Sequence, residues 1–538
     1  MSGISLLALD GSNTIGGSKL LLRYDDNQVL LDFGTSFKKF GTYYEEYLKP
    51  RSTGGLLDYV VMGVLPDAKN LYRKDLMHPE LILKGPDVGR IDALLLSHAH
   101  ADHFGDMGFL RLDVPFVTSA MSAIIVKAMA DTGKSDMGKD HICPSPRQQN
   151  TLRGTPIVES CSVKEARELG VKGRDLVIID SDIPEQFRQF WSFSPSIEMS
   201  DEPKRCKPHI PGAVRTGIDS IRLKSYPVDH SIKGACAYVI PTTQGNVVYT
   251  GDLRMHGING HMTEDFIGGA KSPRPYVLIT EGTRVGRVSD SSPDAEPTTE
   301  KQVLENATQL MSEMDGDFVI ADFGPRNIER LEIFLDVARK HHRKMVVTTK
   351  DAYLLHAMHI VDPSVPIPGS DILIFDCPKG SESKYEEYML QRVYPEATIK
   401  GGDIGRSPGD YLVSFSFFDL KHLVDIKPEK GHYLYSSCEA FGEEQEIDFI
   451  RMGAWLKKFY LKLYGFSFDQ DGRPVFPKGP GSLHASGHAT KVDLARIVRG
   501  IDPEVVVPVH TEHAEWFTDN FGGERKVVVP DSEGWIEL

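Results

Sequence analysis

Four potential metal ligands stand within six residues, in the segment His-Ala-His-Ala-Asp-His. They are His98, His100, Asp102 and His103. The apolar run 91–96 comes directly before them and predicts a buried strand, which would hold the first ligands on rigid backbone. His98 and His100 are two positions apart, so in an extended chain they point to the same side. Asp102 and His103 fall on the following turn, where they can face a second ion. Solvated loop histidines rarely gather in this way, so the segment predicts a metal centre. Imidazole and carboxylate groups suit zinc and, less strongly, manganese.

Two more potential ligands follow predicted strands farther along the chain. The strand 222–226 leads into His230, and the strand 247–250 is followed by a Gly-Asp pair that ends in Asp252. In a β-sandwich, these strand ends would bring His230 and Asp252 to the same edge as the first cluster. Taken singly, either residue is an ordinary turn or capping residue.

Acidic and imidazole groups follow predicted strands at three further places. Asp32 closes the strand 29–32, Glu281 follows the strand 276–280, and a late apolar strand leads into His510. Before that late strand lies the loop Leu-His-Ala-Ser-Gly-His-Ala, which contains His484, Ser486 and His488. From residue type alone, these are polar turn and cap residues.

The elements that must position these residues begin with a β-meander. Strands are predicted at 4–9, 19–24, 29–32 and 114–118. A helix over 119–129 follows the last of these. Between 133 and 216 the pattern weakens, with many charged, proline and serine residues around a short strand at 176–179. This stretch predicts an insertion or a lid.

A second pattern begins at about residue 289. A polar, proline-bearing linker comes first, and Thr299 with Gln302 predicts a capping box that opens a helix. Strand, helix and strand then follow at 318–323, 327–342 and 344–349. This order indicates a parallel sheet. Further strands are predicted at 411–417 and 432–436, a long helix at 443–464, and a last helix at 492–500. The sequence therefore divides into 1–288, the α/β insert 289–478, and the return segment 479–538.

Composition excludes several classes of protein. The 538 residues are 40% hydrophobic and 25% charged, as in an ordinary globular protein of several domains. The net charge of −15 argues against a basic protein that coats nucleic acid, although it permits a local basic channel. None of the cysteines forms a CxxC pair, no signal peptide is evident, and no apolar run approaches the roughly 18 residues that cross a bilayer. We therefore expect a cytoplasmic protein that does not engage a membrane.

In chain order, the His-Ala-His-Ala-Asp-His segment, His230 and Asp252 resemble the ligand series of the metallo-β-lactamase superfamily. The α/β insert, Glu281, the Ser-Gly-His loop and His510 narrow the resemblance to the β-CASP nucleases. The stretch His-Ala-Ser-Gly-His-Ala resembles their RNase J-like group. This resemblance implies an α/β fold, in which an αββα metallo-β-lactamase sandwich carries an inserted α/β β-CASP domain with a parallel sheet flanked by helices. It covers most of the chain outside 133–216.

The resemblance also implies a two-metal site. The first metal would be held by His98, His100 and His230, and the second by Asp102, His103 and His510. Asp252 would bridge the two ions, and the nucleophile would be a metal-bound hydroxide between them. The implied cofactors are two Zn²⁺ per chain, with Mn²⁺ as an alternative.

Further roles follow from the same resemblance. Asp32 would orient the ligand loop by hydrogen bonds. Asp102 would help to orient the attacking water, and His488 would contact the phosphate and protonate the leaving oxygen, with Glu281 fixing its ring. The residues that bind phosphate would be His484, Ser486 and His488.

The implied function is a two-metal ribonuclease that cuts single-stranded RNA as a 5′–3′ exonuclease, an endonuclease or both. A His at the last ligand position, here His510, favours RNA over DNA in this family, and a DNA-directed β-CASP nuclease is the close alternative. A small-molecule hydrolase of the same superfamily shares the first ligands but needs neither the insert nor the His488 loop. An inactive scaffold usually lacks ligands, and every expected ligand position is filled here. Formation of a homo-oligomer is left open.

Overall fold

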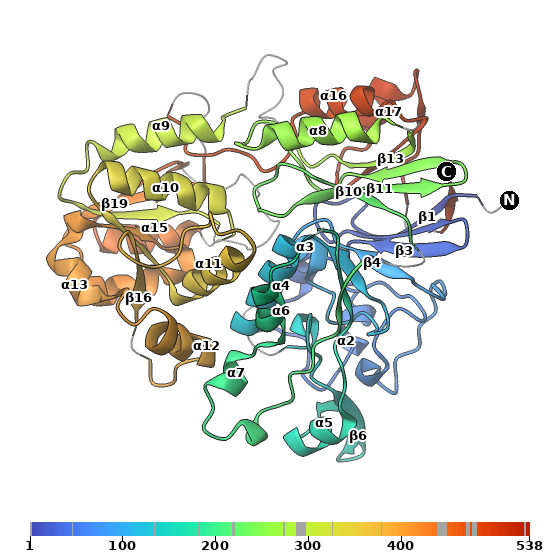
Figure 1. The fold of residues 1–538 in the computed structure, drawn as a ribbon, viewed down its shortest axis with the longest axis horizontal. Helices are drawn as coiled ribbons and strands as arrows, with labels where there is room; N and C mark the ends of the chain where they lie inside the picture. Colours follow the sequence, from blue (N-terminus) through green and yellow to red (C-terminus); the bar gives the residue numbers. More distant parts are fainter. Residues whose placement is uncertain are drawn as a thin grey trace.

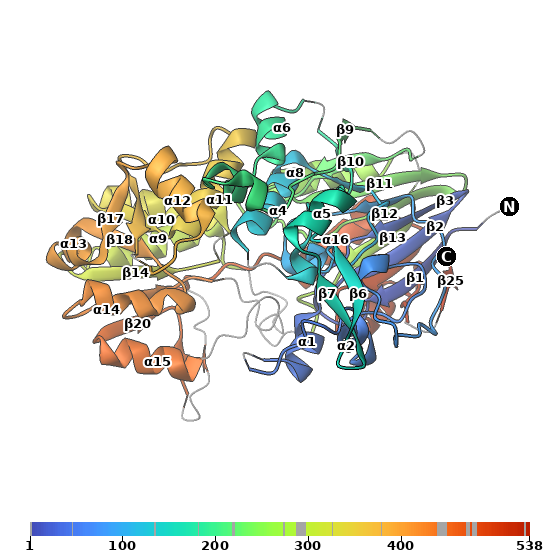
Figure 2. The ribbon, with the colours of Figure 1, turned by 90° about the horizontal axis from the view of Figure 1, so that it is seen from below.

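The computed structural model describes residues 3–538 except 46, 134–135, 181, 218–220, 273–274, 287–296, 325, 378, 438–448, 470–473, 476–480 and 532–533. Figures 1 and 2 show two lobes, a sandwich of two sheets and an α/β lobe formed by the insert.

The first sheet of the sandwich has eight strands. In sheet order they are β25 (Ile536–Glu537), β1 (Ser5–Asp10), β2 (Lys19–Tyr24), β3 (Asn27–Leu31), β4 (Ala93–Leu95), β5 (Phe116–Thr118), β8 (Leu176–Ile178) and β9 (Val214–Thr216). The strands β1 to β3 form the predicted antiparallel meander, and from β3 to β9 every neighbouring pair is parallel. The carboxyl ends of these parallel strands therefore meet at one edge.

The second sheet has six strands. In sheet order they are β10 (Lys224–Pro227), β11 (Cys236–Thr242), β12 (Gly245–Tyr249), β13 (Pro275–Glu281), β23 (Val505–Val509) and β24 (Lys526–Val527). The strands β13 and β23 are parallel neighbours, although the whole insert lies between them in the chain. The return segment therefore completes a sheet that the first part of the chain begins.

Apolar residues on alternate positions of both sheets form the core between them. Leu20, Leu22 and Leu31 of the first sheet share one buried cluster with Val247 and Ile279 of the second. Period-two alternation places these side chains on the inner face of each sheet.

Helices cover both outer faces of the sandwich, which gives the expected αββα order (Figure 1). Against the first sheet lie α3 (Ala101–Phe104) and α4 (Ala120–Thr132), and against the second lie α8 (Gly260–Ala270), α16 (Lys491–Ile501) and α17 (Glu515–Phe521). Helix α4 begins where predicted, because the Ser119 side chain accepts a hydrogen bond from the Ser122 amide.

The insert contributes a seven-stranded sheet in which every pair is parallel. In sheet order its strands are β17 (Thr398–Lys400), β16 (Ile372–Asp376), β15 (Lys344–Val347), β18 (Tyr411–Ser414), β14 (Phe318–Asp322), β19 (Gly431–Tyr435) and β20 (Leu461–Tyr464). Its main helices are α9 (Glu300–Met311), α10 (Ile328–Lys340), α11 (Thr349–Val361), α13 (Gly401–Arg406) and α15 (Phe449–Lys458). The capping box of Thr299 and Gln302 is present at the start of α9. The predicted fold class is confirmed.

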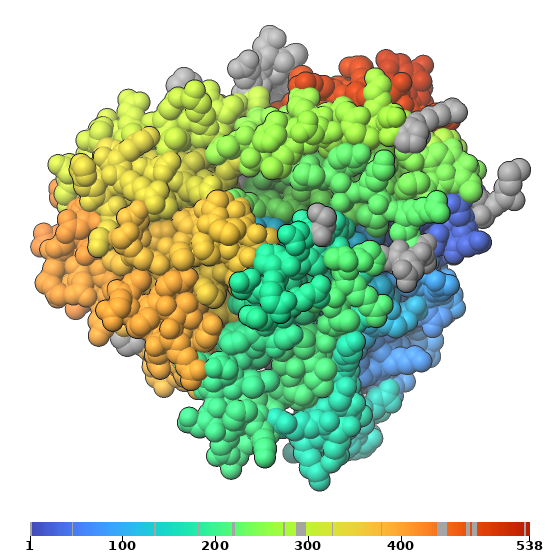
Figure 3. All heavy atoms as spheres, viewed as in Figure 1, coloured from blue at the N-terminus to red at the C-terminus, as the bar shows by residue number. Residues whose placement is uncertain are grey.

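The stretch 133–216 is only partly an addition to the sandwich. Its strands β8 and β9 extend the first sheet, because three consecutive buried apolar residues make β8 a core strand. The hairpin of β6 (Arg147–Leu152) and β7 (Thr155–Ser160) is followed by α5 (Val163–Leu169), and these elements lie together at one end of the molecule in Figure 1. Helix α6 (Glu185–Ser192) contacts both α4 and α11, and Figure 3 shows this part of the chain in teal against the yellow and orange insert.

The prediction of one long helix over 443–464 is wrong over 459–464. Helix α15 ends at Lys458, Tyr460 takes a left-handed conformation with φ 51°, and β20 then pairs with β19. A left-handed residue stops an α-helix because its backbone cannot continue the right-handed path. Residues 443–448 and most of the linker at 289–297 lie outside the described residues, so the division of the chain at 288 and 478 stays a prediction.

Helix α11 follows β15 directly, where the sequence analysis predicted only the strand. Seven of its residues are buried, because it packs against the insert sheet and against α4 of the sandwich. A helix that is covered on more than one side lacks the apolar stripe that marks an amphipathic helix. At this contact Tyr353 donates a hydrogen bond of 2.7 Å to Asp131, which joins the two lobes.

The remaining α-helices of the described residues are short. They are α1 (Phe37–Tyr43), α2 (Leu57–Val61), α7 (Pro195–Glu198), α12 (Lys384–Glu387) and α14 (Leu423–Ile426).

Candidate metal centre

Three imidazoles converge at the edge where the parallel strands end. His98 and His100 follow β4, and His230 follows β10. Nδ1 of His100 lies 3.1 Å from Nε2 of His98 and 3.0 Å from Nε2 of His230. The structure therefore brings together the three histidines that the resemblance assigns to the first metal.

Hydrogen bonds on the far side of two rings fix which nitrogen faces the centre. His98 Nδ1 lies 3.0 Å from the Ser97 hydroxyl, and His230 Nδ1 donates to the Gly487 carbonyl at 2.6 Å. Both rings therefore turn Nε2, with its lone pair, toward His100. Burial, followed by the neighbouring imidazoles, holds the pKa of His98 well below its usual range and lowers the pKa of His230 to about 4. Neutral, convergent imidazole nitrogens fit a bound cation.

A second set of four side chains lies beside the first. Asp102, His103, Asp252 and His510 bring one ligand atom each within 4.8 Å of one another. His103 Nε2 is 3.0 Å from Asp252 Oδ2, and His510 Nε2 is 3.3 Å from Asp102 Oδ2. Asp252 Oδ2 is also 3.8 Å from His98 Nε2, so this carboxylate lies between the two sets.

The residues of the second set also fit a metal ion. Among the described residues, the buried Oδ1 of Asp252 has no hydrogen-bond partner. A buried carboxylate oxygen without a donor is costly, and a cation would satisfy it. Burial works to lower the pKa of His103, but the Asp252 and Asp102 carboxylates outweigh it and hold that pKa well above its usual value.

Asp32 supports the ligand segment from beneath. It accepts hydrogen bonds of 2.7 Å from the Ser97 amide, the Ser97 hydroxyl and His103 Nδ1, and another from the Tyr249 hydroxyl. Its backbone is left-handed, with φ 58°, so the chain turns sharply after β3. The bond to His103 Nδ1 directs Nε2 of that ring to the centre. Tyr249 was not identified from the sequence, because nothing in the surrounding residues distinguishes it from an ordinary strand residue.

Two contacts of His510 were also not identified from the sequence. The Thr283 hydroxyl lies 2.9 Å from His510 Nδ1. The Gly16 amide donates to Nε2 at 2.9 Å, and Gly16 has a φ of 78°. The loop before β2 therefore reaches into the second set. His510 would have to give up this amide to bind an ion through Nε2.

A carboxylate and imidazole pair stands next to Asp252. His488 Nδ1 is 3.0 Å from Glu281 Oε2 and 3.8 Å from Asp252 Oδ2. The other Glu281 oxygen accepts the Leu253 amide at 2.9 Å. All three side chains are buried. The structure thus brings Glu281 and His488 together, as the resemblance implies.

His488 belongs to a loop that we call the His488 loop, residues 482–488. Within it the Ser486 hydroxyl accepts the His488 amide at 3.2 Å. The structure argues against a phosphate-binding role for His484. Its Nδ1 faces the Ser437 carbonyl at 2.8 Å and its Nε2 faces the Gly465 carbonyl at 2.6 Å, so this ring joins two segments of the insert.

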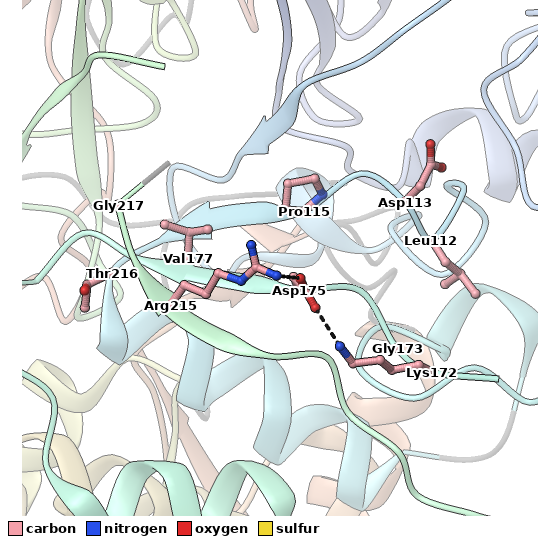
Figure 4. Close-up of a pocket in the computed structure, with 10 residues that line it drawn as sticks. All are labelled: Leu112, Asp113, Pro115, Lys172, Gly173, Asp175, Val177, Arg215, Thr216 and Gly217. Atoms are coloured by element: carbon pink, nitrogen blue, oxygen red, sulfur yellow. Dashed lines mark hydrogen bonds and ion pairs between the residues drawn. The ribbon is translucent and has the colours of Figure 1, made fainter. Parts of the chain in front are cut away.

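The hollow shown in Figure 4 is a separate feature. An ion-paired group of Lys172, Asp175 and Arg215 lines it, together with Asp113 and Pro115. Most of these residues precede β5 or β8, whereas the candidate ligands follow strands. The hollow therefore lies at the amino ends of these strands and does not contribute to the metal centre.

Two family models match segments that contain candidate ligands. A model described as "Metallo-beta-lactamase superfamily" matches residues 65–140, which contain the first ligand segment. A model described as "Zn-dependent metallo-hydrolase RNA specificity domain" matches residues 482–530, which contain His488 and His510.

Relatives extend over nearly the whole chain. Ribonuclease J 2 of Streptococcus pyogenes is 21% identical over 525 residues, covering 96% of this chain and 71% of that protein. Ribonuclease J of Pyrococcus abyssi is 21% identical over 517 residues, covering 95% and 90%. A crystal structure of a protein of unknown function from Enterococcus faecalis shares the fold, with a TM-score of 0.62, 20% identity and full coverage of both chains.

Within the described residues, no helix is long and apolar enough to span a membrane. The sandwich, the insert between β13 and β23 and the matched segments lead to one assignment. The chain is similar to metallo-β-lactamase-fold proteins of the β-CASP, RNase J-like type.

Proposed function

We propose that this protein is a two-metal ribonuclease that hydrolyses phosphodiester bonds of single-stranded RNA. The observation that carries the proposal is the position of Asp252. It lies in the second ligand set, 3.8 Å from His98 of the first set, and 3.8 Å from His488. One carboxylate thus lies between two ligand sets and beside an imidazole that could act as the acid, the groups that a two-ion phosphodiesterase uses.

Two comparisons support RNA as the polymer. The matched segment described as an RNA specificity domain contains both His488 and His510. The relatives that cover the chain are named ribonuclease J. A DNA-directed nuclease would use the same ligands, so DNA is the polymer against which the proposal is tested.

The two ions would be held as the ligand sets suggest. His98, His100 and His230 would hold one, Asp102, His103 and His510 the other, and Asp252 would be shared. When bound, two divalent cations such as zinc or manganese would neutralise phosphate charge and lower the pKa of water at the site. Two features of the site would favour these ions. They are the buried Oδ1 of Asp252 and the convergent imidazole nitrogens of the first set.

The remaining steps belong to protein side chains. Asp102 accepts a hydrogen bond from the attacking water, orients it toward phosphorus and takes the proton that this water loses. As the new P–O bond forms, the bond from phosphorus to the leaving 3′ oxygen breaks, and His488 gives that oxygen its proton. Glu281 holds His488 through Nδ1, so the ring meets the substrate through Nε2. The Ser486 hydroxyl, close to His488, binds a neighbouring phosphate.

The direct test is degradation of end-labelled single-stranded RNA and matched DNA by the purified protein with zinc or manganese. Mononucleotides released progressively from 5′-monophosphorylated RNA establish a 5′–3′ exonuclease, and internal cuts establish an endonuclease. Equal cleavage of DNA refutes the preference for RNA. No cleavage of either polymer, with two ions bound per chain, refutes the proposed function.

A further inference from the structure

The His488 loop is held on one side by side chains of the insert. Arg330 of α10 donates to the Leu483 carbonyl at 2.9 Å, and the Ser436 hydroxyl donates to the same oxygen at 2.7 Å. Asn306 of α9 donates to the Ser482 carbonyl at 2.9 Å. The start of the loop is therefore fixed to the insert by main-chain carbonyls.

The other side of the loop is held by the sandwich. Arg254, two residues after Asp252, donates to the Ser486 carbonyl at 3.1 Å, and His256 Nε2 lies 3.1 Å from the same oxygen. The next carbonyl, that of Gly487, accepts from His230. The end of the loop is therefore fixed to the segment that carries the candidate ligands.

Glu300 joins the two sides. This first residue of α9 accepts a hydrogen bond from Arg254 Nη1 at 3.1 Å. It also accepts hydrogen bonds from Arg330, through Nε at 3.1 Å and through Nη2 at 2.9 and 3.0 Å. The three residues are at most 1% exposed. Burial works to raise the pKa of Glu300, but the two arginines outweigh it and lower the pKa, so the side chain stays ionised.

Two further carboxylates contact Arg254. Its Nε is 3.4 Å from Asp229, and its NH2 contacts Glu329 of α10. A planar guanidinium with several donors can hold carboxylates and a carbonyl at once, which an ammonium group cannot do with the same geometry. The ion pairs of Arg254 therefore connect the segment beside the candidate metal ligands to the insert.

We propose that Arg254, Glu300 and Arg330 form a clamp between the lobes that positions His488 for proton donation. This inference rests on the proposed function. The three residues are positioning residues, since they touch loop carbonyls and one another and do not touch the reacting atoms. The clamp gives the insert a part in the reaction. The proton donor stands in place only while both lobes hold its loop.

The test uses Glu300→Gln in the full-length protein, with Glu305→Gln as the matched control. Glu305 is on the same helix and exposed. The clamp predicts that Glu300→Gln lowers kcat on RNA on the order of a hundredfold, because a displacement near 1 Å at a reacting group has effects of this size. KM and the number of bound zinc ions stay as in the control. Equal kcat values for the two variants overturn the proposal.

A double-variant cycle with His488→Ala separates positioning from general loss of stability. If Glu300 acts through His488, adding Glu300→Gln to His488→Ala lowers kcat no further. Full multiplication of the two effects overturns the clamp. Should Glu300→Gln fail to fold, Asn306→Ala replaces it in the same cycle, because Asn306 holds the same loop from a half-buried position.

A measurement without substrate keeps the clamp distinct from the proposed function. Amide hydrogen exchange in residues 482–488 should be faster in Glu300→Gln than in Glu305→Gln, with exchange in the sandwich strands unchanged. Unchanged exchange in the loop overturns the clamp even if the protein cuts RNA. If exchange in the loop is faster in Glu300→Gln but the protein cuts neither polymer, the ribonuclease function is refuted. The role of the clamp in proton donation is then refuted too, and the clamp only orders the loop.

Discussion

The two ligand sets at the edge of the sandwich differ in the charged groups that surround their imidazoles. The first set, His98, His100 and His230, contains no carboxylate, and burial holds the pKa of each ring below its usual value. The second set has two carboxylates beside His103 and His510, and they raise the pKa of both imidazoles despite burial. The first set can thus accept a cation without losing protons, whereas the second must exchange protons for its ion.

The largest expected effect is that of Asp252→Ala, because this carboxylate lies between the sets. We expect loss of bound metal from the second set, weaker binding at the first, and a fall in RNA hydrolysis of at least about a thousandfold. Metal analysis of the purified variant, together with the RNA assay, measures both effects. Full metal content in this variant would remove the basis for treating Asp252 as shared.

His488→Ala should leave both sets loaded while it slows turnover. Loss of a general acid costs roughly a hundredfold to ten-thousandfold in rate. The measurement is kcat on RNA with zinc content determined on the same sample. If this variant lost both ions, His488 would be a ligand and the distinction between ligands and proton donor would be wrong.

Thr283→Val should weaken zinc binding at the second set and leave the first set unchanged. The substitution keeps the shape of the side chain but removes the hydroxyl that lies 2.9 Å from His510 Nδ1. Loss of such a supporting contact typically weakens metal binding about tenfold to a hundredfold. Zinc titration by calorimetry should show this loss at one site, with the other unchanged. Equal weakening at both sites would show that the sets do not bind independently.

The smallest effect is a difference in pH dependence. Below neutral pH, His103 and His510 hold protons because their pKa values are raised, so zinc binding at the second set weakens as pH falls. The first set stays neutral until pH approaches the pKa of His230, about 4. Zinc titrations between pH 8 and 5.5 should therefore show a falling affinity at one site only. An equal loss of zinc affinity at both sites as pH falls would contradict the proposed difference between the two sets.

The predictable part of the site consists of residues that directly follow apolar strands. His98, Asp252 and His510 stand after β4, β12 and β23, and their strands are buried runs that the sequence shows clearly. Asp32 and Glu281 were found for the same reason. The local pattern marked them as polar residues at strand ends, and the resemblance to the β-CASP nucleases implied their roles and the fold class.

The parts that could not be predicted depend on contacts between distant segments. Tyr249 and Thr283 gain their roles by facing Asp32 and His510, and no local pattern marks them. His484 looked equivalent to His488 in sequence, but its ring turns to carbonyls of the insert. Arg254 resembles any surface arginine until the insert places Glu300 beside it.

The pairing of β13 with β23 has a consequence for the order in which the protein forms during synthesis. Residues 277–281 pair with 505–509, so this part of the sheet closes only after the whole insert has emerged from the ribosome. Contacts so far apart in the chain form late. The nascent chain contains His98, His100 and His230 long before His510 exists, but the Gly487 carbonyl that orients His230 also belongs to the return segment. Both ligand sets, with the activity that we propose for the pair, therefore wait for the return segment to be synthesised.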